Sequence, residues 1–132
     1  MKKAILLLSA VFVLSLMNVA ANKTSVTLSI PDSATAGEEI TIVINVSHSA
    51  NSGLHHTDWV YLKINDVEVK RWEYSRDSLP PAADFTLEFK YTVPADADPE
   101  KGLSVEVEGD CNIHGTAGPA DATITLTGKK QD

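Results

Sequence analysis

The sequence has very few of the residues that cross-link small domains or bind polyanions. It contains one cysteine, Cys111, and this excludes an internal disulfide framework. Basic residues are also scarce, since 11 Lys and Arg stand against 18 Asp and Glu, for a net charge of −7. An acidic chain repels nucleic acid and anionic lipid headgroups, so we expect no nucleic-acid partner.

Long apolar runs are missing from the chain except near its start. One run covers residues 4–17, follows two lysines and ends in the small residues Val19-Ala20-Ala21. It is shorter than the roughly 20 apolar residues that span a bilayer, and this pattern is typical of a secretory signal peptide. We therefore predict a signal peptide over residues 1–21 and a periplasmic or secreted mature chain without membrane insertion. Removing the two lysines leaves 9 basic residues against 18 acidic ones, a net charge of −9.

Helical periodicity is also missing, and apolar residues instead alternate with polar ones. Such alternation occurs in seven segments, at residues 26–30, 40–46, 59–64, 67–71, 85–91, 103–107 and 122–126. Turn-forming Pro, Gly, Asn and Asp residues separate most of them. The pattern predicts an all-β fold, an immunoglobulin-like antiparallel β-sandwich of about seven strands. About 110 residues suffice for one core, so residues 22–132 should form a single domain.

The histidines are concentrated around two short segments. His48, His55 and His56 lie within nine residues of each other, and His114 follows Cys111 by three positions. A thiolate and several imidazoles at such spacings can bind one metal ion if the two loops meet. A lone thiol in an oxidising compartment must be buried, paired with another molecule or bound to a metal, and the histidines favour the metal.

Taken singly, histidines in a polar loop are more commonly solvated surface groups than ligands. Their coincidence with the only cysteine of the chain favours the metal site. Because His55 and His56 are neighbours at the start of a strand, their side chains should point to opposite faces. We therefore expect only one of the two to be a ligand.

Two motifs resemble those of a known family. The segment Cys111-Asn112-Ile113-His114-Gly115 resembles the Cys-Asn-x-His-Gly signature of the superoxide reductase and desulfoferrodoxin iron-binding domain, which includes the neelaredoxins. The segment His55-His56-Thr57-Asp58-Trp59 resembles the His-His/Tyr-x-x-Trp segment of that family, and His48 stands near a preceding family histidine. The resemblance extends more weakly over most of the mature chain.

The resemblance implies a mononuclear iron centre in an immunoglobulin-like sandwich. It assigns the axial thiolate to Cys111 and equatorial imidazoles to His48, His55 and His114, with one face open to superoxide. It implies reduction of superoxide to hydrogen peroxide with electrons from a donor protein that the sequence does not identify. Lys23 matches a family lysine that attracts superoxide, which makes it the candidate catalytic residue.

The chain departs from the family pattern at several positions. Thr24 stands where the family has its first equatorial histidine, and Asn22 replaces the preceding carboxylate. Ser49 replaces the proline after His48, and Asp110 replaces an aromatic residue before the cysteine. The remaining set of one thiolate and three imidazoles also suits tetrahedral zinc or copper.

Three functions therefore remain open from the residues. The chain is a one-iron superoxide reductase without a rubredoxin-like centre, a zinc- or copper-binding module, or a carrier with Cys111 as its reactive thiol. No Ser-His-Asp arrangement, phosphate-binding glycine loop or paired-carboxylate site is evident, and hydrolase chemistry is poorly supported. The sequence leaves homo-oligomer formation open.

Overall fold

The structure of the chain is a computed structural model that describes residues 22–128. The predicted signal peptide, residues 1–21, lies outside the described residues. Eight strands follow one another: β1 (Ser25–Ser29), β2 (Ser33–Thr35), β3 (Glu39–Ser47), β4 (Thr57–Ile64), β5 (Val67–Glu73), β6 (Phe85–Thr92), β7 (Leu103–Cys111) and β8 (Ala120–Thr127). Residues 22–128 contain no helix that could cross a membrane.

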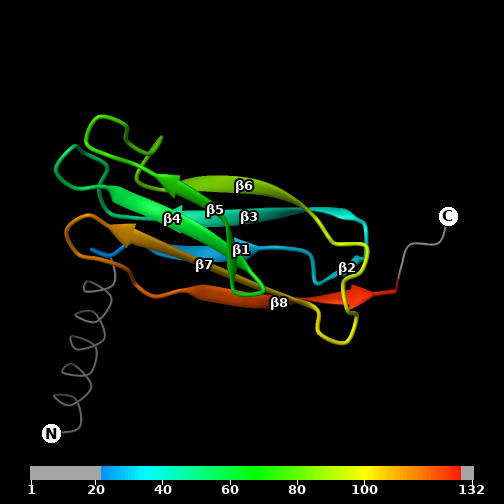
Figure 1. Cartoon of the computed structure of the whole chain (residues 1–132). Coiled ribbons are helices and arrows are strands. Elements are labelled where there is room, and N and C mark those ends of the chain that lie inside the picture. The colour runs from blue at the N-terminus through cyan, green and yellow to red at the C-terminus, as the bar shows by residue number, and fades with distance from the viewer. Residues whose placement is uncertain (1–21, 129–132) are drawn as a thin grey trace, which may run out of the picture.

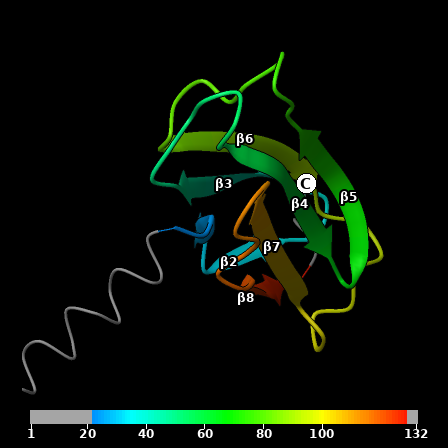
Figure 2. The ribbon, with the colours of Figure 1, turned by 90° about the vertical axis from the view of Figure 1, so that its left-hand side faces the viewer.

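The strands form two sheets that pack face to face (Figures 1 and 2). One has three strands in the order β1-β3-β6, and the other has five in the order β2-β8-β7-β4-β5. The predicted all-β, immunoglobulin-like sandwich is confirmed. The sequence did not predict β2, which pairs in parallel with β8, whereas the other pairs are antiparallel. Three residues are too few for an alternating pattern to be recognised.

The core lies between the sheets. It is formed by the inward-facing side chains, which occupy every second position along the strands. On β3, for example, Ile42 and Ile44 are fully buried, whereas Thr41 is exposed and Val43 is half-buried. The largest fully buried apolar side chains are Ile42, Ile44, Leu62, Leu103, Ile124, Val60, Val93, Val105 and Val107. Each buried aliphatic side chain contributes about 1.5–3 kcal/mol, so this layer holds the two sheets together.

Strand register brings the histidine loop and the cysteine to one end of the sandwich. Thr57, the first residue of β4, pairs with Cys111, the last residue of β7. β3 ends and β1 begins at this same end, since Ser25 pairs with Ser47. The loops after β3, β5 and β7 therefore gather there, on the left of Figure 1 and facing the viewer in Figure 2. We call this region the loop end.

Gly109 allows the start of β1 to lie close to β7. A Cβ atom at this position would lie 2.8 Å from Thr24 Cγ2 and 3.2 Å from Val26 Cγ1, too close for any side chain. The glycine thus permits the approach that places Thr24 beside the cysteine-bearing strand.

The opposite end of the sandwich contains the hairpin between β4 and β5. Asn65 and Asp66 adopt positive φ angles of 50° and 66°, which is the backbone of a type I′ turn. The Asn65 side chain accepts a hydrogen bond from the Ser104 N–H at 2.9 Å. We call this region the hairpin end.

Candidate metal centre

Cys111 begins a tight turn that holds its sulfur inside the protein. The N–H of Cys111 donates to the carbonyl of Gly115 at 2.8 Å, and the N–H of Gly115 donates back to Cys111 at 3.0 Å. The turn needs the positive φ of Gly115, which is +80°. The backbone N–H groups of Ile113 and His114 lie 3.5 and 3.4 Å from Cys111 Sγ. These donors stabilise negative charge on the sulfur, as a metal-binding thiolate requires.

His48 follows β3 directly, and Asp84 anchors its backbone. The Asp84 carboxylate accepts hydrogen bonds from the Ser47 hydroxyl at 2.9 Å and from the His48 N–H at 3.2 Å. Nδ1 of His48 lies 2.7 Å from the Ala50 carbonyl, which can only accept, so Nδ1 carries the proton. Nε2 is left with a lone pair. It is buried and has no hydrogen-bond partner within residues 22–128.

His55 stands at the end of a second turn in the same loop. Its N–H lies 3.2 Å from the carbonyl and 3.1 Å from the hydroxyl of Ser52, and its own carbonyl accepts from the Ser52 N–H at 2.8 Å. Its ring meets that of His48 edge-on at a centroid distance of 4.7 Å. The pKa of His55 is lowered, first by desolvation and then by the neighbouring His48, His114 and His56 rings. A neutral imidazole is the form that binds metals.

Asn112 joins the two loops through three hydrogen bonds. Its backbone N–H donates to the His56 carbonyl at 3.1 Å, and its Oδ1 accepts from the His56 N–H at 2.9 Å. Its Nδ2 donates to the Leu54 carbonyl at 3.1 Å. Asn112 thus bonds the residues on both sides of His55, Leu54 and His56, and these contacts hold the histidine loop against the Cys111 turn. The sequence motif contained Asn112, but its spacing gave no indication of this role.

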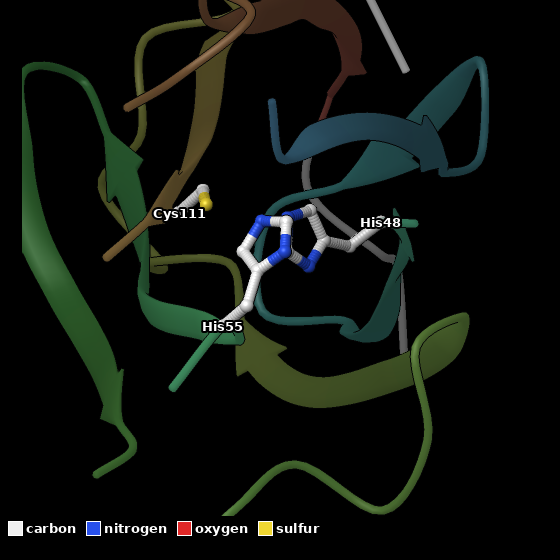
Figure 3. A group of neighbouring side chains, drawn as sticks. All are labelled: His48, His55 and Cys111. Atoms are coloured by element: carbon white, nitrogen blue, oxygen red, sulfur yellow. The ribbon is translucent and has the colours of Figure 1, made fainter. Parts of the chain in front are cut away.

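Three predicted ligands meet at the loop end, and the fourth lies beside them. Ligand atoms of His48, His55 and Cys111 lie within 4.8 Å of one another and point to a common space (Figure 3). Two ligands on opposite sides of one ion are separated by about 4.4 Å at bond lengths of about 2.0–2.3 Å, so small side-chain rotations would close the set. Nδ1 of His114 lies 3.2 Å from His55 Nε2 and 3.8 Å from Cys111 Sγ.

His56 faces away from this group, as its position next to His55 predicted. It is 4% exposed, with Nδ1 2.9 Å from the Ser52 carbonyl and Nε2 3.8 Å from the Asp58 carboxylate. Its ring thereby helps fix the Ser52–His55 turn. We assign His56 a structural role in shaping the loop.

Thr24 lies inside the sandwich, next to the cysteine-bearing strand. It is fully buried, and its hydroxyl lies 3.0 Å from the hydroxyl of Thr57, the residue paired with Cys111. Its carbonyl accepts from the Ala117 N–H at 3.0 Å. Lys23 directly precedes it and is half-buried, and its ammonium forms no ion pair in the part of the chain that the structure describes.

Negative charge borders the centre on the outer face of the five-stranded sheet. Desolvation raises the pKa of Asp110, and the nearby Asp58 and Glu108 carboxylates raise it further. Beside them, the Tyr61 hydroxyl lies 2.8 Å from both Glu106 and Glu108, and burial and these carboxylates raise the pKa of Tyr61 well above its usual value. The sequence identified Asp110, but it did not indicate that several carboxylates accumulate there.

The donor set fits a metal ion. A buried acceptor without a partner costs about 1–3 kcal/mol, and Nε2 of His48 is such an acceptor, placed beside a second imidazole and a thiol. Metal-binding histidines commonly donate their other N–H to a carbonyl, as Nδ1 of His48 does to Ala50. Imidazole and thiolate ligands suit iron, zinc and copper alike.

Comparisons with known proteins place this geometry in context. The sequence profile of the desulfoferrodoxin family matches residues 17–117. Among curated protein sequences, none matches the chain. A superoxide reductase (neelaredoxin) from Ignicoccus hospitalis has a similar structure, with a TM-score of 0.60 and 18% identity over 80% of this chain and 83% of that one.

A second similar structure is a CARDB domain from Pyrococcus furiosus, solved in complex with di-metal ions. It aligns with a TM-score of 0.56 and 13% identity over 83% of this chain and 97% of that chain. At these identities, the structural matches show a shared sandwich fold and nothing about activity. The profile match covers more than half of the chain and includes both the histidine loop and the cysteine turn.

Proposed function

The chain belongs to the desulfoferrodoxin family, and from that membership we propose that it binds one iron ion and reduces superoxide to hydrogen peroxide. The ligands we propose are Cys111, His48, His55 and His114. We further propose that residues 1–21 direct export and that the protein works in the periplasm or outside the cell. The acidic mature chain with its single cysteine is compatible with that compartment.

The buried Nε2 of His48 is the observation that carries the proposal. The Ala50 carbonyl and burial to 6% exposure hold the ring in one orientation, and the Asp84 carboxylate fixes the backbone that bears it. The orientation directs an unpaired lone pair toward His55 and Cys111. A solvated histidine would not need this support, because water would satisfy its nitrogen.

The residues around the site suit one-electron chemistry at a site open on one side. Iron bound here would supply the single electron that, with two protons, converts superoxide to hydrogen peroxide. The backbone N–H groups of Ile113 and His114 point at the Cys111 sulfur and hold it in place for a metal ion. His114 is exposed and His55 half-buried, so a small anion reaches the ligands from solvent. Lys23 supplies a positive charge near the start of β1, which offsets the acidic surroundings.

A second candidate is a four-coordinate zinc or copper site, and Thr24 favours it. This residue stands where the family has a histidine, and its hydroxyl already pairs with Thr57 inside the sandwich. The chain thus offers three imidazoles and one thiolate, the donor count of a tetrahedral site. A thiol-carrier function is less well supported, because Cys111 is only 2% exposed.

A superoxide assay on the mature protein separates the two candidates. Protein loaded with Fe²⁺ should consume superoxide and form one peroxide per superoxide in the presence of a reductant. Zn²⁺-loaded protein should consume none, because zinc has no redox chemistry. Cys111→Ser and His48→Gln should each reduce the rate at least tenfold, and Lys23→Ala should reduce it less while weakening its salt dependence. Consumption no faster than that of the metal-free protein would overturn the proposal.

Export is tested separately. Mass spectrometry of protein from the periplasmic fraction should give a chain that begins at Asn22. A chain that keeps residues 1–21 in the cytoplasmic fraction would contradict this part of the proposal.

A further inference from the structure

Large apolar side chains that are exposed to solvent concentrate at the loop end. Within residues 22–128, four such side chains occur: Leu54, Val67, Ile113 and Leu79, with 76%, 63%, 57% and 37% exposure. Leu54, Leu79 and Ile113 lie on the three loops of the loop end, whereas Val67 lies at the hairpin end. Exposed apolar groups gathered in one region mark an interaction surface more often than scattered ones do.

Two of these side chains border the proposed ligands directly. Leu54 precedes His55 and Ile113 precedes His114, so each ligand-bearing loop presents one apolar side chain beside an imidazole. The hydrogen bond from Asn112 Nδ2 to the Leu54 carbonyl ties the two loops together. Their backbone is already ordered, and a partner that covers them would not have to order it.

The loop between β5 and β6 extends this apolar surface. Its Pro80 carbonyl accepts a hydrogen bond from Asn51 Nδ2 at 2.8 Å, and its Arg76 side chain lies close against Gly53. These contacts hold Leu79 on a loop that lies beside the histidine loop. We name Leu54, Leu79 and Ile113 the apolar rim.

Acidic groups predominate around the apolar rim. Asp58, whose side chain is 43% exposed, lies at the start of β4, and Asp110 is half-buried at the end of β7. Asp77 and Asp84 are exposed on the loop between β5 and β6. Arg76 and Lys23 are the basic residues of the same region. A partner for this surface therefore carries apolar groups at its centre and basic groups at its edge.

We propose that the apolar rim is the docking surface of a basic redox protein that donates electrons to the metal centre. This inference rests on the proposed function, which needs one electron for each superoxide. The partner gives up one electron as the oxidised iron takes one up, and no bond forms or breaks. Electron-transfer complexes are commonly small, below about 1,200 Å² of buried surface, so a few apolar side chains with a charged border suffice.

Electron exchange with cytochrome c, a basic haem protein, tests the surface. The second-order rate in stopped flow should fall at least tenfold in the double variant Leu54→Ser/Ile113→Ser. The matched control Val67→Ser removes an equally exposed side chain at the hairpin end and should stay within twofold of the unaltered protein. Reduction by ascorbate should be equal in all three, since a small reductant needs no docking surface. The cytochrome c rate should also fall as salt rises.

An NMR titration of the zinc-loaded protein separates a failure of this inference from a failure of the proposed function. Adding ferrous cytochrome c should shift the amide signals of residues 52–56, 76–80 and 111–116, and leave those of residues 65–68 unchanged. If iron-loaded protein consumes no superoxide, the proposed function fails while the titration still reports on the surface.

Four results would each overturn the inference. They are equal cytochrome c rates in the double variant and Val67→Ser, a cytochrome c rate that rises with salt, self-association through the rim, and binding of the rim to neutral lipid vesicles.

Discussion

The two ends of the sandwich manage their polar groups in different ways. At the hairpin end, the two-residue Asn65-Asp66 turn closes the strands, and the Asn65 side chain accepts the Ser104 N–H from β7. At the loop end, side chains from distant segments fix the loops, such as Asp84 for His48 and Asn112 for His56. In spite of this support, the buried Nε2 of His48 finds no hydrogen-bond partner in the part of the chain that the structure describes.

The contrast separates the part of the fold that serves stability from the part that gathers the candidate ligands. A connection that serves only folding needs a tight turn, as Asn65 and Asp66 supply. The loop end instead holds two imidazoles and a thiol within 4.8 Å of one another, and one imidazole nitrogen there is buried without a partner among residues 22–128. The hairpin end and the core therefore serve stability, and we propose that the loop end serves metal binding.

The largest expected effect is the loss of metal-dependent stability in Cys111→Ser. Metal at about 1,000 times its dissociation constant should raise the free energy of unfolding of the unaltered protein by about 4 kcal/mol. The variant should show little of this gain, whereas its metal-free stability should change far less. Denaturant unfolding with and without Fe²⁺ or Zn²⁺ measures both. An equal metal-dependent gain in the variant would show that the cysteine is not a ligand.

Gly102→Ala, at the hairpin end, should destabilise the fold without weakening metal binding. Gly102 has a φ of +66°, and a Cβ there would lie 2.8 Å from the Ile124 carbonyl oxygen. We expect a loss of about 2–3 kcal/mol in the free energy of unfolding, with unchanged metal affinity in the folded protein. Gly128→Ala is the control, since a Cβ at Gly128 meets nothing within 4 Å. A large loss of metal affinity in Gly102→Ala would mean that the two ends are coupled.

Asn112→Ala and Asn65→Gly form a matched pair across the two ends. Each asparagine accepts a backbone N–H at 2.9 Å, from His56 and Ser104 respectively. Asn112→Ala should lower metal affinity about 10- to 100-fold, because it releases the loop that positions His55. Asn65→Gly should cost about 1 kcal/mol of stability and leave metal affinity unchanged. Isothermal titration with Zn²⁺ reports the affinities, and equal affinities in the pair would remove Asn112 from the positioning role.

The smallest expected effect is a pH dependence of the metal-free protein. The folded-state pKa of His55 lies below the ordinary histidine value of 6.5, so the unfolded chain binds the proton more readily. The contribution of this group to stability is complete above about pH 6.5 and is lost as the pH falls through that value toward the lower folded-state pKa. Unfolding from pH 7.5 to 5.5 should show this decline, and His55→Gln should flatten it. An identical pH profile in the variant would assign the effect to other groups.

The sequence predicted the sandwich because alternation is a strong local signal. The alternation of Ile40, Ile42 and Ile44 on β3 was recognisable without any tertiary contact, and so was the Asn65-Asp66 turn. The short β2 was not, since only its pairing with β8 makes it a strand. Its three residues adopt an extended conformation because a neighbour supplies the hydrogen bonds.

The candidate site was predictable only as far as its ligand types. His48, His55, His114 and Cys111 could be chosen from clustering and from the family motif. Asp84, which anchors His48 from 36 positions away, carries no sequence signal, because a lone aspartate before a strand is common. The Thr24–Thr57 contact depends on how close Gly109 lets β1 come to β7, and spacing along the chain does not encode this.

The iron centre is tested most directly by metal analysis and visible absorption of the mature protein, purified from iron-replete cells and treated with a mild oxidant. We expect about one iron per chain and a thiolate-to-iron charge-transfer band that Cys111→Ser and His48→Gln both abolish. Colourless protein that contains zinc, or no metal, would contradict the iron centre.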